Sequence, residues 1–165
     1  MILGSAPLTI THVAISLIGI FSGLVVLYGL LKSKRLDGWT ALFLVTTALT
    51  SITGFIFFPF HGVTPGIVVG IISMVLLAIA VVARYPLHMA GPWRWIWVVT
   101  AMMAEYLNVF VLVVQSFQKV PALKALDPTQ SGPPFKATQG FVLGLFVVLI
   151  IAAAIKFRPE PAQTA

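Results

Sequence analysis

Five long apolar stretches dominate this 165-residue chain, and the short segments between them hold nearly all of its charged residues. The stretches cover residues 8–31, 39–58, 64–83, 93–117 and 137–155. A hydrocarbon core about 30 Å thick takes roughly 20 helical residues to cross, and each stretch has about that length. Only 8% of the residues are charged, against about 25% in soluble domains. The sequence therefore predicts an all-α membrane protein, a compact bundle of five transmembrane helices.

These stretches leave no room for a second folded domain. We expect residues 1–157 to form one transmembrane helical domain and residues 158–165 to form a disordered cytoplasmic tail. The net charge of +6 does not indicate a nucleic-acid partner, because the lysines and arginines lie at the ends of the stretches and in loops. Nucleic-acid binding would call for a basic face. The partner that the composition predicts is the lipid bilayer.

The basic residues are unequally divided between the two sides of the predicted bundle. One side holds Lys32, Lys34, Arg35, Arg84, Arg94, Lys156 and Arg158, and the other holds Lys119, Lys124 and Lys136. Because loops rich in lysine and arginine tend to stay in the cytoplasm, this division predicts the N-terminus outside and the C-terminus inside. The tryptophans at positions 39, 93, 95 and 97 fall near the predicted cytoplasmic interface, where we expect them to act as anchors.

The connection between the fourth and fifth stretches, residues 118–136, is the only one long enough to hold structure of its own. It contains four prolines. Loops of this length are often either functional or disordered. We expect one interfacial helical turn in it, over residues 121–126.

Small residues repeat at helical spacing on four of the five stretches. They are Gly19 and Gly23, Thr46, Thr50 and Gly54, Gly66 and Gly70, and Gly140 and Gly144. Small residues at this spacing let two helices approach closely in a membrane. We expect these grooves to hold the bundle together, with self-association of the protein through one of them as the alternative.

The fourth stretch carries a polar stripe. At 100° per residue, four of its side chains fall within about 80° of one another on a helix: Glu105, Asn108, Gln115 and Lys119. At 1.5 Å per residue Glu105 lies about 18 Å into the stretch, near the bilayer midplane. A carboxylate at this depth costs roughly 2.5–3.5 kcal/mol on insertion scales, so it usually faces the bundle interior.

Two residues on neighbouring stretches, Thr50 and Ser73, are expected at a depth similar to that of Glu105. Together with the stripe they suggest an ion, proton or small-ligand site formed by Glu105, Asn108, Gln115, Thr50 and Ser73. A quinone bonded to Glu105 is a further hypothesis. The alternatives are a hydrogen bond between helices, from Glu105 to Thr47 or Thr50, and a tolerated acid with no role.

Two of the three histidines, His12 and His61, lie on the same predicted outer side at similar depth. A haem held without covalent attachment needs axial ligands, commonly histidines from facing helices. The pair is therefore a candidate site for haem b or a metal ion. The alternative is a pair of interfacial histidines bonded to headgroups or backbone. A zinc site would need a third protein ligand, which the sequence does not offer at a matching distance.

The sequence contains none of the common catalytic motifs. It has no cysteine and only four acidic residues, which excludes thiolate metal sites and disulfides and disfavours a carboxylate acid–base pair. No phosphate-binding glycine loop and no metalloprotease or hydrolase signature is found. We therefore expect that the protein has no enzymatic activity of its own.

Four runs of sequence are distinctive: LDGWTALFL (36–44), FPFHG (58–62), YLNVFV (106–111) and KVPALKAL (119–126). Together they resemble a group of uncharacterised small multipass inner-membrane proteins of proteobacteria. The resemblance implies a location in the bacterial inner membrane and transfers no activity. The sequence thus predicts an accessory, interaction or self-associating membrane protein. An ion or small-ligand conduit around Glu105 and a redox protein binding haem or quinone remain the alternatives.

Overall fold

The computed structural model describes residues 5–57 and 62–159, and all the regular structure in these ranges is helical. The helices are α1 (Ser5–Leu31), α2 (Asp37–Phe57), α3 (Pro65–Arg84), α4 (Trp93–Lys119), α5 (Pro121–Leu126) and α6 (Pro133–Lys156). All but α5 are long and apolar enough to cross a membrane. This confirms the five predicted spans, and α5 is the short helix expected in the long loop.

Prolines set the start of three helices. Pro65, Pro121 and Pro133 each occupy the first turn of their helix, where a missing N–H group costs no helical hydrogen bond. Thr64 caps α3 by accepting a hydrogen bond from the N–H of Ile67 at 3.3 Å. Helix α6, the fifth predicted stretch, therefore begins at Pro133, four residues before the predicted start at residue 137. The reason is that Pro133 and Pro134 belong to the helix rather than to the loop.

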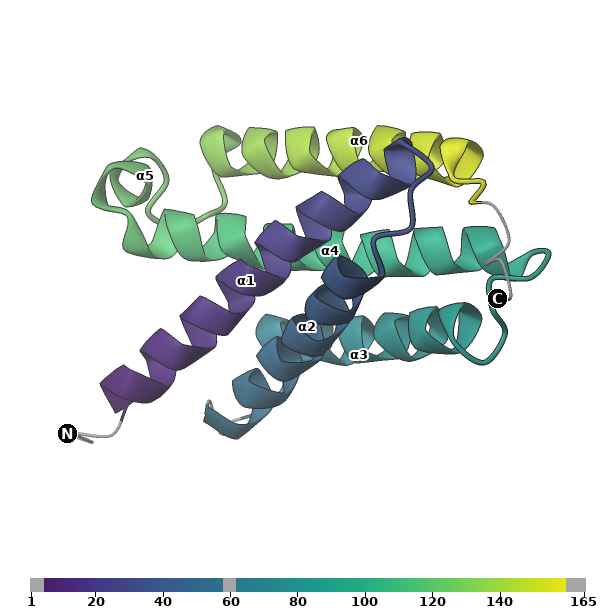
Figure 1. Cartoon of the computed structure of the whole chain (residues 1–165). Helices are drawn as coiled ribbons and strands as arrows, with labels where there is room; N and C mark the ends of the chain where they lie inside the picture. Colours follow the sequence, from purple (N-terminus) through teal and green to yellow (C-terminus); the bar gives the residue numbers. More distant parts are fainter. Residues whose placement is uncertain (1–4, 58–61, 160–165) are drawn as a thin grey trace.

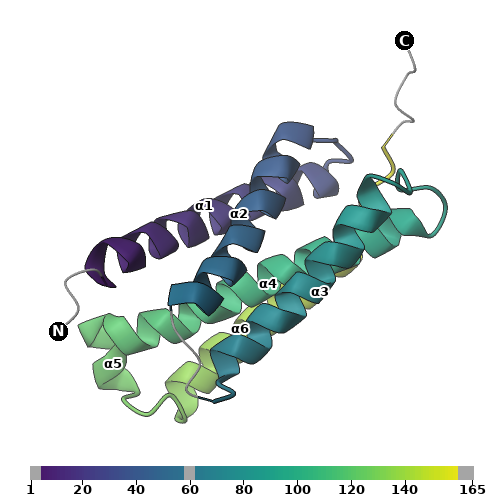
Figure 2. The ribbon, with the colours of Figure 1, turned by 90° about the horizontal axis from the view of Figure 1, so that it is seen from below.

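The helices are arranged in two layers (Figure 1). One layer contains α3, α4 and α6, with α4 in the middle, and the hairpin of α1 and α2 crosses this layer at an angle. Figure 2, seen from below, shows α1 and α2 together against the other three helices. The α1–α2 loop, the α3–α4 loop and the last turn of α6 meet at what we call the C-terminal end. The start of α1, the start of α6 and α5 lie at the opposite, N-terminal end.

The apolar core lies mainly in the half of the bundle near the C-terminal end. Its most deeply buried members include Leu30, Phe43, Ala80, Ala83, Trp97, Val98 and Phe157. In contrast, no side chain of residues 6–18 in α1 is buried. The bundle is thus tightly packed near its C-terminal end and looser toward its N-terminal end.

A buried arginine ties the helices together at the C-terminal end. The side chain of Arg84 is 3% exposed and forms an ion pair with Asp37 at the start of α2. Its guanidinium also lies 4.7 Å from the centre of the Trp97 ring. Trp97 is 0% exposed, so its predicted role as an interfacial anchor is wrong. Its ring packs under Arg84 instead of reaching the headgroups.

The C-terminus of α6 is capped by Arg94 and tied to the α1–α2 loop by the residue that follows it. The guanidinium of Arg94 donates hydrogen bonds to the carbonyl oxygens of Ala154, at 2.9 Å, and Phe157. The backbone N–H of Arg158, the first residue of the predicted tail, donates to Ser33 Oγ at 2.9 Å. Residues 160–165 of that tail lie outside the described residues.

The small residues of α1 and α2 pack against each other, as predicted. A Cβ atom added to Gly19 would lie 3.3 Å from Thr46 Oγ1, and one added to Gly54 would lie 3.6 Å from the His12 ring. These short distances show that the two helices approach closely because their facing residues are small.

The prediction that Gly140 and Gly144 hold the bundle together is wrong. A Cβ atom added to either residue would meet nothing within 4 Å among the described residues. Gly66 has only its own capping residue nearby, whereas Gly70 receives the ring of Phe55 from α2. The glycine groove of α6 therefore faces away from the other helices.

A buried carboxylate orders the long loop before α6. Asp127 is 3% exposed, and its side chain accepts hydrogen bonds from the backbone N–H groups of Ser131, Gly132 and Phe135, the shortest of them 2.9 Å, from Gly132. These donors lie at the start of α6, where backbone N–H groups lack partners within the helix. Asp127 thus caps α6 from a distance.

We expect Asp127→Ala to destabilise the protein by about 1–2 kcal/mol, the typical cost of losing a helix cap. Unfolding in detergent micelles measures this loss, and trypsin should then cleave faster after Lys124 in α5 and Lys136 in the first turn of α6. Asp127→Asn keeps one acceptor oxygen and is expected to lose less. Unchanged unfolding and cleavage in Asp127→Ala would show that the loop does not depend on this carboxylate.

Candidate ion-binding site

The candidate site is centred on Glu105, halfway along α4. Its side chain is 0% exposed, and neither of its carboxyl oxygens has a hydrogen-bond partner in the described part of the chain. Buried polar groups are nearly always hydrogen-bonded, so an unpaired one calls for an explanation. Trp97 Nε1 and Gln139 Oε1 are also buried without a partner, but among the described residues Glu105 is the acidic side chain in this position, and both of its oxygens lack one.

Gly23 of α1 makes room for this carboxyl group. A Cβ atom added to Gly23 would lie 2.2 Å from Glu105 Oε2 and 2.4 Å from its carboxyl carbon. The carboxyl thus occupies the space where any other residue would place its side chain. Figure 1 shows α1 crossing α4 near the middle of α4. Gly23 of α1 contacts Glu105 of α4.

The polar neighbours of Glu105 are already paired. Thr47, 0% exposed on α2, accepts a hydrogen bond of 3.1 Å from the amide of Asn108. Ser22 donates to the carbonyl oxygens of Ile18 and Gly19 in its own helix. Asn108 also lies close to the Glu105 carboxyl, but no group in the described part of the chain meets hydrogen-bond geometry with its oxygens.

The alternative of a hydrogen bond from Glu105 to Thr47 or Thr50 is not found, because neither carboxyl oxygen has a hydrogen-bond partner in the described part of the chain. Thr47 accepts its bond from Asn108, and Thr50 donates to the carbonyl of Thr46 at 2.8 Å. The sequence placed these residues at the correct depth but did not show which helix each hydroxyl would face.

Two other residues of the predicted site, Gln115 and Ser73, lie apart from Glu105. Gln115 is half-buried nearly three turns further along α4, toward the N-terminal end, and Ser73 is buried on α3. Within the described residues neither is bonded to Glu105. The structure thus pairs Glu105 with Gly23 and Asn108 with Thr47, and neither Gly23 nor Thr47 belongs to the predicted set of site residues.

His12 lies near the N-terminal end between α1 and α2. Its Nδ1 is 2.7 Å from Thr53 Oγ1. His61, the other half of the candidate haem or metal pair, lies outside the described residues. Across residues 5–57 and 62–159, no three histidine, aspartate or glutamate side chains come together as a metal site.

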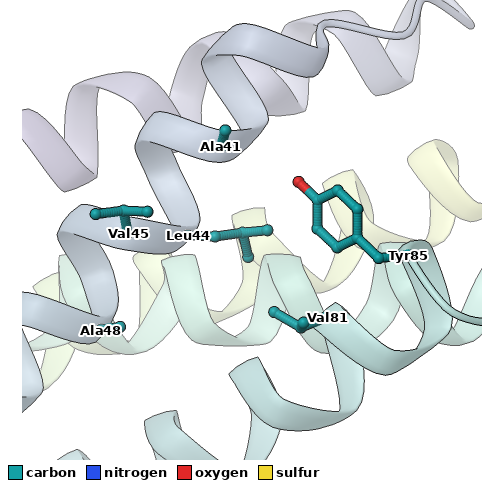
Figure 3. Close-up of a pocket in the computed structure, with 6 residues that line it drawn as sticks. All are labelled: Ala41, Leu44, Val45, Ala48, Val81 and Tyr85. Atoms are coloured by element: carbon teal, nitrogen blue, oxygen red, sulfur yellow. The ribbon is translucent and has the colours of Figure 1, made fainter.

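An apolar groove separates α2 from α3 (Figure 3). It has a volume of about 290 Å³ and is lined by Ala41, Leu44, Val45, Ala48, Val81 and Tyr85. Among these six side chains only Tyr85 carries a polar group, and Figure 3 shows its hydroxyl pointing toward α2. None of the predicted site residues lines this groove, so it is separate from the Glu105 site.

Comparisons with protein-family models, with curated proteins and with solved structures found no match.

Proposed function

We propose that this protein binds and releases a proton at Glu105 in the interior of a membrane-embedded helix bundle. The observation that supports this is the burial of the Glu105 carboxyl with neither oxygen hydrogen-bonded. An ionised carboxylate buried without a partner costs far more free energy than the neutral acid. Ionisation of Glu105 therefore requires a change around it, which couples its proton to the packing of α1 on α4.

A proton fits this site better than a metal cation does. A hard cation such as Ca²⁺ takes six to eight oxygen ligands and Mg²⁺ takes six, with waters among them. Here the carboxyl packs directly against Gly23, and across the described residues no three histidine, aspartate or glutamate side chains, Glu105 included, gather as a metal site. A proton needs no additional ligands and no additional volume.

Infrared difference spectroscopy in reconstituted vesicles tests the proposal. A step in pH should change the C=O stretch of a protonated carboxylic acid, and Glu105→Gln should abolish that change. The substitution keeps the size of the side chain, so we expect the unfolding transition to stay within about 1 kcal/mol of the parent protein.

The assignment to Glu105 depends on the difference between the parent protein and this variant. Asp127→Asn is the matched control, because Asp127 is also a buried acid but bonds to three backbone N–H groups. It should leave the pH-dependent carboxyl band in place. A band that persists in Glu105→Gln would refute the proposal.

We also propose a second function, as a self-associating or accessory subunit, because α6 is poorly covered. Phe141 is 70% exposed and Val148 is 64% exposed, and the groove of Gly140 and Gly144 is free of contacts from the described residues. Open grooves of this type favour close helix pairing in membranes. Gly140→Leu should then reduce cross-linking of copies in vesicles, and unchanged cross-linking would argue against this surface.

We propose that the protein lies in a bacterial inner membrane with its N-terminal end outside. Seven of its ten basic residues lie at the C-terminal end of the bundle, which favours that end in the cytoplasm. The resemblance of its distinctive sequence runs to proteobacterial inner-membrane proteins supports the location. A fluorescent reporter fused after Ala165 should fluoresce only if the C-terminus is cytoplasmic, and an alkaline phosphatase fusion there should be inactive.

A further inference from the structure

Small and polar residues of α1 form a line from Glu105 to the N-terminal end. His12, Ser16, Gly19 and Gly23 follow one another at intervals of three or four, which places them on one face of the helix. Gly23 contacts Glu105, and Gly19 contacts the threonines of α2. This face is the one that α1 turns toward α2 and α4.

The opposing face of α2 is lined by hydroxyl groups. Thr47 lies beside Asn108 and Gly19, and Thr53 bonds to His12 near the N-terminal end. Thr50 lies between them in the sequence, on a similar face. We call these residues of α1 and α2, from Gly19 and Thr47 to His12 and Thr53, the polar seam.

The hydroxyls of the polar seam can accept hydrogen bonds from water. Ser16, Thr50 and Thr53 each donate to a carbonyl oxygen of their own helix, which leaves lone pairs on their oxygens for water. All three side chains are only half-buried. In hydrocarbon, exposed polar groups are tolerated where they line a water-filled cavity, so the seam is suited to hydration.

Among the described residues, the opposite half of the bundle is mostly apolar. The buried apolar side chains between Glu105 and the C-terminal end, at most 7% exposed, include Val26, Leu27, Leu30, Phe43, Leu44, Trp97, Val98 and Met102, and the buried polar ones include Thr40 and Arg84. A core of this kind is packed too closely to admit water. Glu105 therefore lies at the boundary between the polar seam and a closed apolar half.

We propose that Glu105 exchanges its proton with water on one side of the membrane only, through the polar seam that opens at the N-terminal end. This inference rests on the proposed proton site and gives it a direction. A site open to one side cannot conduct protons continuously. It exchanges its proton with one aqueous phase, and passing it onward would require α1 to move against α4.

Apart from Tyr106, the titratable groups described on the helices around Glu105 lie toward the helix ends. His12 stands at the mouth of the seam, where the charge of Lys119 on α4 also reaches it. Asp37 and Arg84 are paired with each other at the C-terminal end. Tyr106, next to Glu105 in the sequence, packs its ring 5.7 Å from that of Phe146 on α6. The charges of His12 and Lys119, on the seam side, therefore influence proton exchange at Glu105.

Single cysteines test this route cleanly, because the native chain has no cysteine. Ser16→Cys and Thr50→Cys place a thiol of similar size in the seam on two different helices. Leu17→Cys and Leu49→Cys are their sequence neighbours on faces that are 49% and 40% exposed, expected to face lipid. Ala101→Cys and Ala80→Cys probe the closed half, where both alanines are 0% exposed.

A membrane-impermeant methanethiosulfonate, applied to oriented vesicles from each side, measures access. It reacts with the thiolate, which forms in water and not in hydrocarbon. We expect the seam cysteines to react about tenfold faster than the lipid-facing ones, from the N-terminal side only. The cysteines at positions 80 and 101 should not react from either side.

Equal labelling of seam and lipid-facing cysteines would refute the hydrated seam. Labelling of the seam from both sides, or labelling at positions 80 or 101, would refute the one-sided exchange. Failure of the proton site itself shows separately, as the absence of a carboxyl band that depends on Glu105. The two failures are therefore distinguishable, and unlabelled samples of each variant report on folding through their unfolding transitions.

Discussion

Gly23→Leu is expected to destabilise the protein by about 3 kcal/mol or more, at the upper end of the cost of overpacking a core. A Cβ atom alone would lie 2.2 Å from Glu105 Oε2, and leucine adds three further carbons at the same point. Glu105 has a flexible side chain, but it is enclosed on all sides, so it cannot move aside without displacing its neighbours. Unfolding in detergent micelles measures the effect.

The matched control is Gly144→Leu on α6. The same change is made there in the middle of a membrane-spanning helix, but a Cβ atom at Gly144 meets nothing within 4 Å among the described residues. We expect its unfolding free energy to stay within about 0.5 kcal/mol of the parent protein. A similar loss in both variants would mean that leucine at a glycine position is harmful irrespective of the α1–α4 contact.

A double-mutant cycle identifies Glu105 as the group that Gly23 accommodates. Gly23→Ala alone is expected to cost about 1–3 kcal/mol. In a Glu105→Ala background the carboxyl is gone, so the added methyl group finds space and most of that cost should vanish. Residues in contact typically show coupling of this kind. Strict additivity of the two substitutions would contradict the contact.

The five helices long and apolar enough to cross a membrane were predictable, because length and apolar composition can be read from the sequence independently of how the helices pair. The rotation of each helix about its axis was only partly predictable. The spacing of Gly19 and Gly23 correctly marked a contact face on α1. The same spacing at Gly140 and Gly144 marked a face that the other helices leave open. The spacing of small residues shows that a helix face allows close approach. Which helix packs against that face is determined by the fold of the whole bundle.

The candidate site shows the same limit. The period of α4 correctly placed Glu105 and Asn108 on the inward side. It did not show that Asn108 would bond to Thr47 and leave Glu105 without a partner, because that choice depends on the crossing of α1 over α4. Depth alone would not have paired the two residues, because Glu105 lies halfway along α4 whereas Gly23 lies well past the middle of α1.

The ion pair at the C-terminal end was also missed, because its arginine was counted only as a loop residue that fixes topology. Asp37 is the only acidic residue at that end among those the structure describes, and seven basic residues share the end with it. That imbalance made a specific partner for Asp37 predictable in principle. The partner is Arg84 because it is buried at the end of α3 and lies over Trp97.

Asp37→Ala is expected to cost about 1–3 kcal/mol of stability. Removing one member of a fully buried ion pair typically costs about 3–5 kcal/mol. We expect less than this for Asp37→Ala because the pair is only half buried: the side chain of Arg84 is 3% exposed, but that of Asp37 is 67% exposed. Water can therefore partly replace the lost carboxylate. Thermal or chemical unfolding in micelles measures the difference. Arg35→Ala is the control, because its contact with Asp37 is longer, at 3.4 Å, and should contribute about 1 kcal/mol at most.

Replacing the arginine as well separates the ion pair from the position of Asp37 in the helix. Arg84→Met keeps an apolar side chain of similar length against Trp97 and Met89 and removes the buried charge, a change that is often nearly neutral for buried pairs. In that background Asp37→Ala should cost only the interaction of an acid with the first turn of α2, about 0.3–1 kcal/mol. If Asp37→Ala is equally costly with arginine or methionine at position 84, the loss comes from the start of α2. In that case the unpaired charge of Arg84 is not its cause.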